Sequence, residues 1–104
     1  MNFNVEKDNI ARIGVANSRH YEITNQDDIK QILEVLNGIT FERCNKNSNE
    51  LGFICKVAIY AESDDELLDF TILSNDCIKI KNIEYKAINK SIDYNKITCF
   101  LGGN

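Results

Sequence analysis

One apolar stripe of helical period constrains this chain more than any other feature of its sequence. It lies in residues 24–41, TNQDDIKQILEVLNGITF, and consists of Ile29, Ile32, Leu33 and Leu36. Residues at this spacing share one face of an α-helix. A helix of this kind draws most of its stability from packing of its apolar face. The rest of the chain is therefore expected to cover that face.

Both ends of this helix carry local signals. Thr24 or Asn25 is placed to accept a hydrogen bond from a free backbone N–H at the start. Two aspartates follow in the first turn, where the helix dipole favours negative charge. Gly38 is expected to end the helix in the left-handed conformation. Together these signals predict a core-packing helix over about residues 26–37.

Alternating apolar residues over 53–85 predict the sheet that covers this helix. With a two-residue turn at residues 63–64, the hydrophobic pattern selects one register, because a shift by one residue would mix charged and core side chains. That register places Phe53 on the core face and pairs Cys55 with Ile72, Val57 with Phe70, Ile59 with Leu68 and Tyr60 with Leu67. Turns at 74–76 and 81–82 extend it, pairing Ile72 with Ile78, Phe70 with Ile80, Ile78 with Tyr85, Ile80 with Ile83 and Lys79 with Glu84. The prediction is a four-stranded antiparallel meander.

The remaining segments complete a single-domain prediction. Alternation predicts short strands near residues 11–15, 21–23 and 39–43, and the polar residues 44–50 are expected to form a loop. Residues 91–101 predict a short C-terminal helix capped by Ser91, with a strand as the competing interpretation. Residues 1–9 are polar and expected to be loose. The predicted fold class is α+β, with an antiparallel meander and one main helix in two layers over residues 1–104.

Charge and hydropathy exclude some classes of function. The net charge of −4 and the isoelectric point near 4.9 argue against binding to nucleic acid. A membrane span would need roughly 20 consecutive apolar residues, and the sequence has no such run. The first ten residues carry charges where a signal peptide would be apolar. We therefore expect a cytoplasmic protein as the sequence is written, or an extracytoplasmic one if a leader has been trimmed.

The search for reactive groups predicts no catalytic, cofactor or metal site. Cys44, Cys55, Cys77 and Cys99 match no zinc or redox spacing. Two disulfides are arithmetically allowed, but the register places Cys55 and Cys77 on opposite faces, and free thiols are expected. His20 is the only histidine and is expected at the surface. The acidic residues 62–66 lack the spacing and glycine of a calcium loop, and the glycines match no phosphate-binding motif.

The second face of the predicted sheet is the candidate interaction surface. A mixed apolar and charged face with an exposed tyrosine is typical of a moderate protein interface. The residues expected to bind a partner there are Tyr60, Leu67, Leu73, Asp69 and Glu84. Tyr60 and Leu67 are expected to form one contiguous apolar spot. The loop at residues 44–50 is the next candidate.

Two segments, YEITNQDDIKQILEVLNGI and IKIKNIEYKAI, resemble small uncharacterised α+β domains of Gram-positive extracellular lipoproteins. Their order also resembles the helix-on-sheet modules of proteinaceous enzyme inhibitors. The resemblance covers residues 10–88 and rests on the start of the helix and the late Tyr85. The chain departs from the lipoproteins in lacking a leader or lipid-anchored cysteine at its start and in having four cysteines. The resemblance implies a non-enzymatic module and supplies no functional residues.

The leading hypothesis is a small acidic non-enzymatic protein-binding module, similar to inhibitors or immunity proteins, that occludes a partner protein. A homodimer is also compatible with this surface. One alternative is a ligand-binding or sensory domain of an exported protein. A further alternative is a small hydrolase, which would need His20 and an acidic residue to meet in a pocket.

Overall fold

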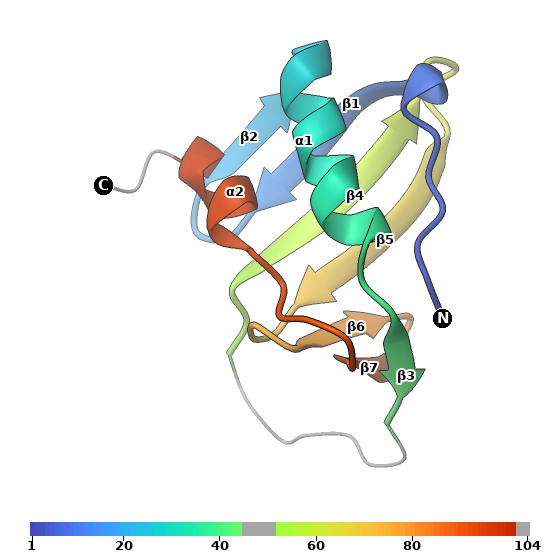
Figure 1. Cartoon of the computed structure of the whole chain (residues 1–104). Coiled ribbons are helices and arrows are strands. Elements are labelled where there is room, and N and C mark those ends of the chain that lie inside the picture. Colours follow the sequence, from blue (N-terminus) through green and yellow to red (C-terminus); the bar gives the residue numbers. More distant parts are fainter. Residues whose placement is uncertain (45–51, 102–104) are drawn as a thin grey trace.

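One curved antiparallel sheet surrounds the main helix (Figure 1). The computed structural model describes residues 1–44 and 52–101. Its strands are β1 (Ile10–Ala16), β2 (His20–Ile23), β3 (Phe41–Arg43), β4 (Cys55–Ala61), β5 (Glu66–Ile72), β6 (Cys77–Ile80) and β7 (Ile83–Ala87). Its helices are α1 (Gln26–Asn37) and α2 (Asn95–Thr98), with 3-10 turns η1 (Lys7–Asn9) and η2 (Cys99–Leu101). The sheet order is β2-β1-β4-β5-β6-β7-β3, so the predicted α+β class and the meander β4 to β7 are confirmed.

Helix α1 has the predicted bounds and start. The side chain of Asn25 accepts hydrogen bonds from the backbone N–H groups of Asp27 and Asp28, at 2.9 and 3.1 Å. The whole apolar stripe is buried, with Leu33 the most exposed member at 3%. Full burial of each such side chain contributes about 1.5–3 kcal/mol. The stripe therefore anchors the helix to the sheet.

The end of α1 differs from the prediction. Gly38 follows the helix with φ −82° and ψ −5°, which is right-handed, so the expected left-handed stop is wrong. A Cβ built on Gly38 would lie 2.6 Å from Nζ of Lys90, the flexible end of a side chain that can move aside, so glycine is not sterically required there. The side-chain amide of Asn89 donates to the Gly38 carbonyl at 3.0 Å. The residues that follow β7 thus contact the end of α1.

The β4–β5 ladder has the predicted core register and a different turn. The three predicted pairs between Cys55–Ile72 and Ile59–Leu68 are present. The N–H of Ala61 donates to the carbonyl of Asp65, so the loop has three residues, with Asp64 in the left-handed region at φ 72°. A bulge then absorbs the extra residue: Tyr60 pairs with Glu66, and Leu67 lies unpaired before Leu68. The predicted two-residue turn and the Tyr60–Leu67 pair are wrong.

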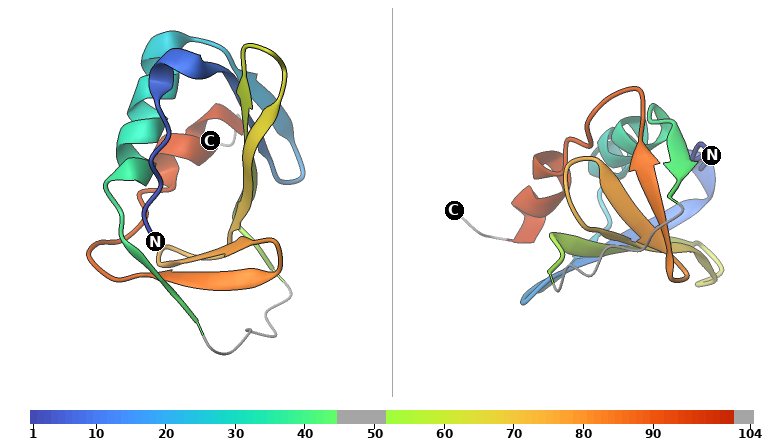
Figure 2. Two further views of the ribbon diagram at one scale, coloured as in Figure 1. Left: turned by 90° about the vertical axis from the view of Figure 1, so that its right-hand side faces the viewer. Right: turned by 90° about the horizontal axis from the view of Figure 1, so that it is seen from below.

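Strands β5 and β6 separate soon after they meet. They pair only through Thr71 with Lys79 and Ile72 with Ile78, so the predicted pair of Phe70 with Ile80 is wrong. The β6–β7 hairpin has all three predicted pairs, and its two turn residues have φ of 49° and 69°, as a tight mirror-image turn requires. In Figure 2 this hairpin runs across the direction of β4 and β5 beneath the end of α1. The bend closes the core at that end.

The chain ends also pack on the core. Phe3 is 6% exposed, and its ring centroid lies 5.4 Å from that of Phe41 and 5.0 Å from that of Phe70. The expectation of a loose N-terminal segment is therefore wrong at Phe3, although Met1, Phe3 and Val5 alternate with polar residues in the sequence. The C-terminal helix is confirmed, but it begins at Asn95 after Tyr94, so the predicted cap by Ser91 is wrong.

Phe53 corrects the predicted start of the β4 core face. It precedes the first paired residue of β4 and is 45% exposed. The alternating sequence pattern starts at Phe53, before the first paired residue of β4, so the pattern alone does not show where the ladder begins. The predicted loop at residues 44–50 lies outside the described residues except for Cys44, which is half-buried.

Candidate functional site

The sheet face opposite the helices carries a shallow depression with a floor of small residues. Helices α1 and α2 lie together on the inner face (Figure 2). On the outer face, the register brings Gly14 of β1 beside Ala58 of β4, with Ala16 next along β1. The depression has a volume of about 220 Å³ and is lined by Gly14, Ala16, His20, Glu22, Lys56, Val57, Ala58, Tyr60 and Asp69. Because the floor side chains are so short, the longer ones around them form walls.

Arg12 organises one wall of this depression. Its guanidinium lies 4.1 Å from the centre of the Tyr60 ring, and its Nε lies 3.4 Å from Oε2 of Glu22. It also forms an ion pair with Asp64 in the β4–β5 loop. The hydrogen bond that Arg12 donates to the Asp64 carboxylate is the main reason that the pKa of Arg12 is raised above its ordinary value. Arg12 therefore holds the Tyr60 ring with a permanent charge.

Asp69 lies on the opposite wall. Ala58 pairs with Asp69 across the β4–β5 ladder, so Ala58 separates Asp69 from Gly14 on the outer face. Asp69 is exposed, and within residues 1–44 and 52–101 its carboxylate has no hydrogen bond or ion pair. Lys56 is also exposed. It precedes Ala58 by two residues in β4, so it lies on the same face. The depression is thus lined by the unpaired carboxylate of Asp69 and by Lys56, whose ammonium lies 5.5 Å from the centre of the Phe53 ring.

The five predicted partner-binding residues do not form one surface. Tyr60 and Asp69 line the depression, while Leu67 is 50% exposed at the bulge, and Tyr60 pairs with Glu66 instead of Leu67. The expected contiguous spot of Tyr60 and Leu67 is therefore wrong. Leu73 is half-buried, and its N–H donates to Cys77 at 2.9 Å in the turn before β6.

Glu84 is buried at 2% exposure, so its expected role as an exposed partner contact is wrong. Its predicted pairing with Lys79 is present. The N–H of Cys44 donates to the Glu84 carbonyl at 2.9 Å, which places the chain after β3 on its other side. The thiol of Cys77 lies 3.7 Å from Oε1 of Glu84. Glu84 is buried because β3 pairs with β7, and these two strands lie far apart in the sequence.

His20 meets an acidic residue, as the hydrolase alternative requires. Its Nε2 lies 3.3 Å from Oε1 of Glu22, and both side chains line the depression. The His20 side chain is 60% exposed. The residues that line the depression include no serine, threonine or cysteine. The pair could orient a water molecule, but no serine, threonine or cysteine nucleophile lines the depression beside it.

The four cysteines are free thiols, as predicted. Burial raises the pKa of Cys55 to about 11. Burial and the neighbouring Glu84 raise the pKa of Cys77 to about 11. Both thiols are therefore protonated and unreactive near neutral pH.

Sequence reasoning missed the floor of the depression and the residue that organises its wall. Gly14, Ala58 and Arg12 come together only when β1 pairs with β4, across more than 40 positions of sequence. The available signal was the run of small residues at alternate positions of β1, which was interpreted only as a strand. In residues 1–44 and 52–101, no group of His, Cys, Asp and Glu is placed to hold a metal ion. In the same residues, no helix has the length and apolar character needed to cross a membrane.

Comparison of the chain with models of protein families, with curated proteins and with solved structures finds no match.

Proposed function

We propose that this chain is a small acidic non-enzymatic protein-binding module that acts, as inhibitors and immunity proteins do, by covering part of a partner protein. The observation that carries the proposal is the shape of the outer sheet face. The helices lie on the inner face, and the outer face of β2, β1, β4 and β5 presents a walled depression. Among the described residues, no segment covers this sheet face. Its walled depression suits a protruding side chain of a partner.

The walls indicate how such a partner would be held. Tyr60 offers an aromatic ring with a polar tip, already fixed by Arg12 at 4.1 Å. Aromatic residues that lose little side-chain freedom contribute strongly to interfaces. Asp69 and Lys56 would contribute mainly to orientation and association rate. A partner that brings a long basic side chain over Ala58 would meet the unpaired carboxylate of Asp69.

The test fills the depression without touching the core. Ala58→Gln adds a long side chain to the floor on the outer face, and we expect it to abolish retention of partner proteins from an extract of the source cells. Lys30→Ala, on the exposed side of α1, is the matched control and should retain them. Thermal melts of the two variants should agree with the wild type. A partner that is retained equally by Ala58→Gln contradicts the proposal.

The His20–Glu22 pair supports the hydrolase as a second candidate. In that case His20 would act as a general base toward water, with Glu22 orienting its ring. The substitution His20→Gln tests this candidate. It should abolish any hydrolysis of a panel of ester, peptide and phosphodiester substrates, and hydrolysis that persists in this variant contradicts a general-base role for His20.

A further inference from the structure

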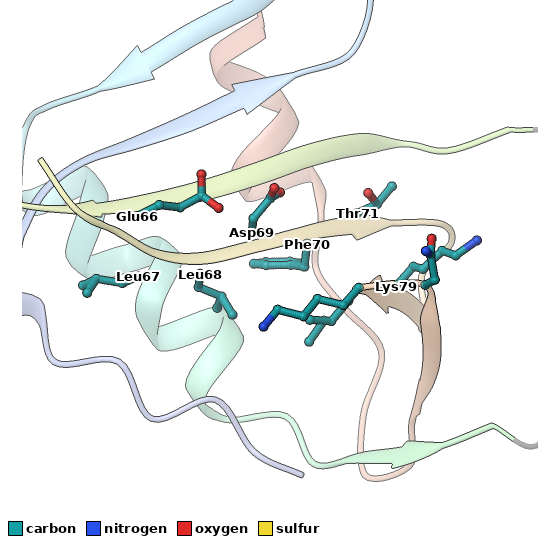
Figure 3. Close-up of a pocket in the computed structure, with 10 residues that line it drawn as sticks. Glu66, Leu67, Leu68, Asp69, Phe70, Thr71 and Lys79 are labelled. Atoms are coloured by element: carbon teal, nitrogen blue, oxygen red, sulfur yellow. The ribbon is translucent and has the colours of Figure 1, made fainter.

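Strand β5 has an open edge. It pairs with β4 throughout its length, but its pairing with β6 is limited to Thr71 and Ile72. Within the described part of the chain, residues 66–70 therefore have no strand on the β6 side. The strands diverge around a wedge of about 600 Å³, lined by residues 66–71 of β5 and 79–82 of the next hairpin (Figure 3).

The hydrogen bonds on either side of β5 show which backbone groups face the wedge. The carbonyl of Ile72 accepts from Ile54, so Ile72 is directed toward β4. The N–H of Leu73 donates to Cys77, so the next residue is directed toward β6. Directions alternate along a strand, and Thr71 pairs with Lys79 as this requires. Asp69 is the next residue directed that way, and its N–H and C=O point into the wedge.

The side chains around this edge are suited to burial. Leu67 is 50% exposed at the bulge, and Leu68 and Ile80 are half-buried against the core. In Figure 3 Leu67 and Leu68 lie on the wedge side of β5, while the Asp69 carboxylate points to the outer face. An added strand would thus bury apolar groups with one set of its side chains. Its alternate side chains would lie beside Asp69.

The charges of β5 select the occupant. Every charged residue from 62 to 71 is acidic, whereas Lys79 and Lys81 line the hairpin wall of the wedge. Pairing of β5 with β5 of a second copy would place Glu66 and Asp69 among the same acids of the partner, which is unfavourable. A strand that carries lysine or arginine beside Asp69 would instead form an opposite-charge pair.

We propose that the open edge of β5 binds an extended segment of a partner protein, with apolar side chains toward Leu68 and Ile80 and a basic side chain beside Asp69. The backbone N–H and C=O of Asp69 would form the first rung of the added strand. This inference rests on the proposed function in assuming a protein partner. It differs in using the edge of β5 and the wedge in place of the floor of the depression.

The first experiment follows the Asp69 amide directly. The full chain, labelled with ¹⁵N, is titrated with a blocked peptide that alternates valine and lysine, and backbone amide exchange is measured by NMR. Without peptide the Asp69 amide should exchange freely, and saturating peptide should slow it at least about tenfold, since it becomes part of a ladder. A peptide that alternates valine and glutamate is the control and should leave it unchanged. An Asp69 amide that the lysine peptide does not slow overturns the proposal.

Two variants separate the backbone from the charge. Asp69→Pro removes the N–H that points into the wedge, and an edge position of this kind tolerates proline; it should lose peptide binding. Asp69→Lys keeps the N–H and reverses the charge, so it should weaken the lysine peptide by about tenfold and strengthen the glutamate peptide. If Asp69→Pro does not fold, the test is whether Asp69→Lys binds the glutamate peptide more tightly, and the lysine peptide less tightly, than the wild type does. Wild-type binding by both variants, or a lysine peptide unaffected by Asp69→Lys, overturns strand addition.

The outcomes distinguish this inference from the proposed function. Loss of partner retention by Ala58→Gln, with no protection of the Asp69 amide by peptide, supports the outer-face module and overturns the open edge as its binding mode. Protection of the Asp69 amide that grows with protein concentration and needs no peptide identifies a second copy as the occupant. That result also overturns the proposal.

Discussion

The two edges of β5 differ in how much of their length is paired. Toward β4, pairing extends from Ile72 to Glu66 with one bulge; toward β6, it covers two residue pairs. The first edge lies over the α1 stripe and is part of the core. The second edge opens into a wedge. One side of β5 is thus paired into the core ladder, while positions 66–70 have no paired strand on the other side among the described residues.

The same difference divides the sheet into two parts. Strands β2, β1, β4 and β5 form a broad ladder, and β6, β7 and β3 form a ribbon that turns across it (Figure 2). The two parts meet through a narrow junction at Thr71 and Ile72. Few shared hydrogen bonds make local opening less costly. The ribbon is therefore expected to open before the broad ladder does.

The largest effect should come from the inner side of β5. Phe70 is 1% exposed and its ring packs against that of Phe3 at a tilt, so Phe70→Ala should lower the free energy of unfolding by about 3–5 kcal/mol. Leu67→Ala, three residues away at the bulge, is the control and should cost less than about 1 kcal/mol because Leu67 is half exposed. Urea denaturation measures both. Equal losses would mean that the wedge side of β5 is as much core as the α1 side.

Thiol chemistry offers the next largest contrast. Cys55 begins β4 and is fully buried, and its pKa of about 11 leaves little thiolate at pH 8. Exposed Cys99 should therefore react with iodoacetamide at least about a hundredfold faster than Cys55. Cys77, half-buried at the start of the ribbon, should have an intermediate rate. Mass spectrometry of the peptides gives the order, and labelling of Cys55 before Cys77 would contradict the division of the sheet.

The raised thiol pKa values also predict a pH dependence. Cys55 and Cys77 have pKa values of about 11 in the folded chain against an ordinary 9.0. The unfolded state therefore loses these protons first as the pH rises, and the folded state becomes less stable between about pH 9 and 11. Below about pH 9 this contribution should be constant. Urea midpoints of the wild type and of Cys55→Ala, measured across this range, check it, and the variant should show a shallower decline.

Amide exchange rates should also distinguish the broad ladder from the ribbon, and we expect this difference to be smaller than the difference in thiol reactivity. Val57 and Phe70 pair within the broad ladder, and Ile78 and Tyr85 pair within the ribbon. We expect the ribbon amides to exchange at least about tenfold faster, through opening at the junction. Uniform exchange across all four amides would show that the sheet opens as one unit. The narrow junction would then have no energetic consequence.

The core register could be predicted because it depends on local alternation. The pairs from Cys55–Ile72 to Ile59–Leu68 separate apolar from charged side chains, and only one register does so. The turn beside them could not be predicted from that pattern. A three-residue loop with a bulge at Leu67 returns to the same pairing at Ile59 as a two-residue turn without one. The hydrophobic pattern is identical in the two cases, and so the exposed Tyr60–Leu67 spot was wrongly inferred.

The candidate site was less predictable because it depends on long-range pairing. Tyr60 and Asp69 were identified from their side of the ladder, and the structure does place both at the depression. Its floor requires β1 beside β4, and Glu84 is buried only because the chain after β3 comes beside β7. Strand order of this kind follows from the closure of the whole core. Alternation within one hairpin carries no information about it.

The smallest expected effect on stability compares two neighbours in β4. Tyr60 points to the outer face, where its ring contacts the Arg12 guanidinium, and Ile59 points inward with 0% exposure. Tyr60→Ala should lower the free energy of unfolding by less than about 1 kcal/mol, the usual contribution of a cation–aromatic contact at an exposed site. Ile59→Ala should cost about 2–5 kcal/mol, because it leaves a cavity beneath α1.

Partner binding should reverse that order. Tyr60→Ala should weaken binding to the partner by more than about 1 kcal/mol, because the substitution removes the aromatic wall of the depression. A conservative Tyr60→Phe should retain the ring contact with Arg12 and most of the affinity. Calorimetric titration beside a thermal melt measures both quantities on each variant. If Tyr60→Ala unfolds the chain as readily as Ile59→Ala, the outer face is part of the core, and the binding site has to be sought at the open edge of β5 alone.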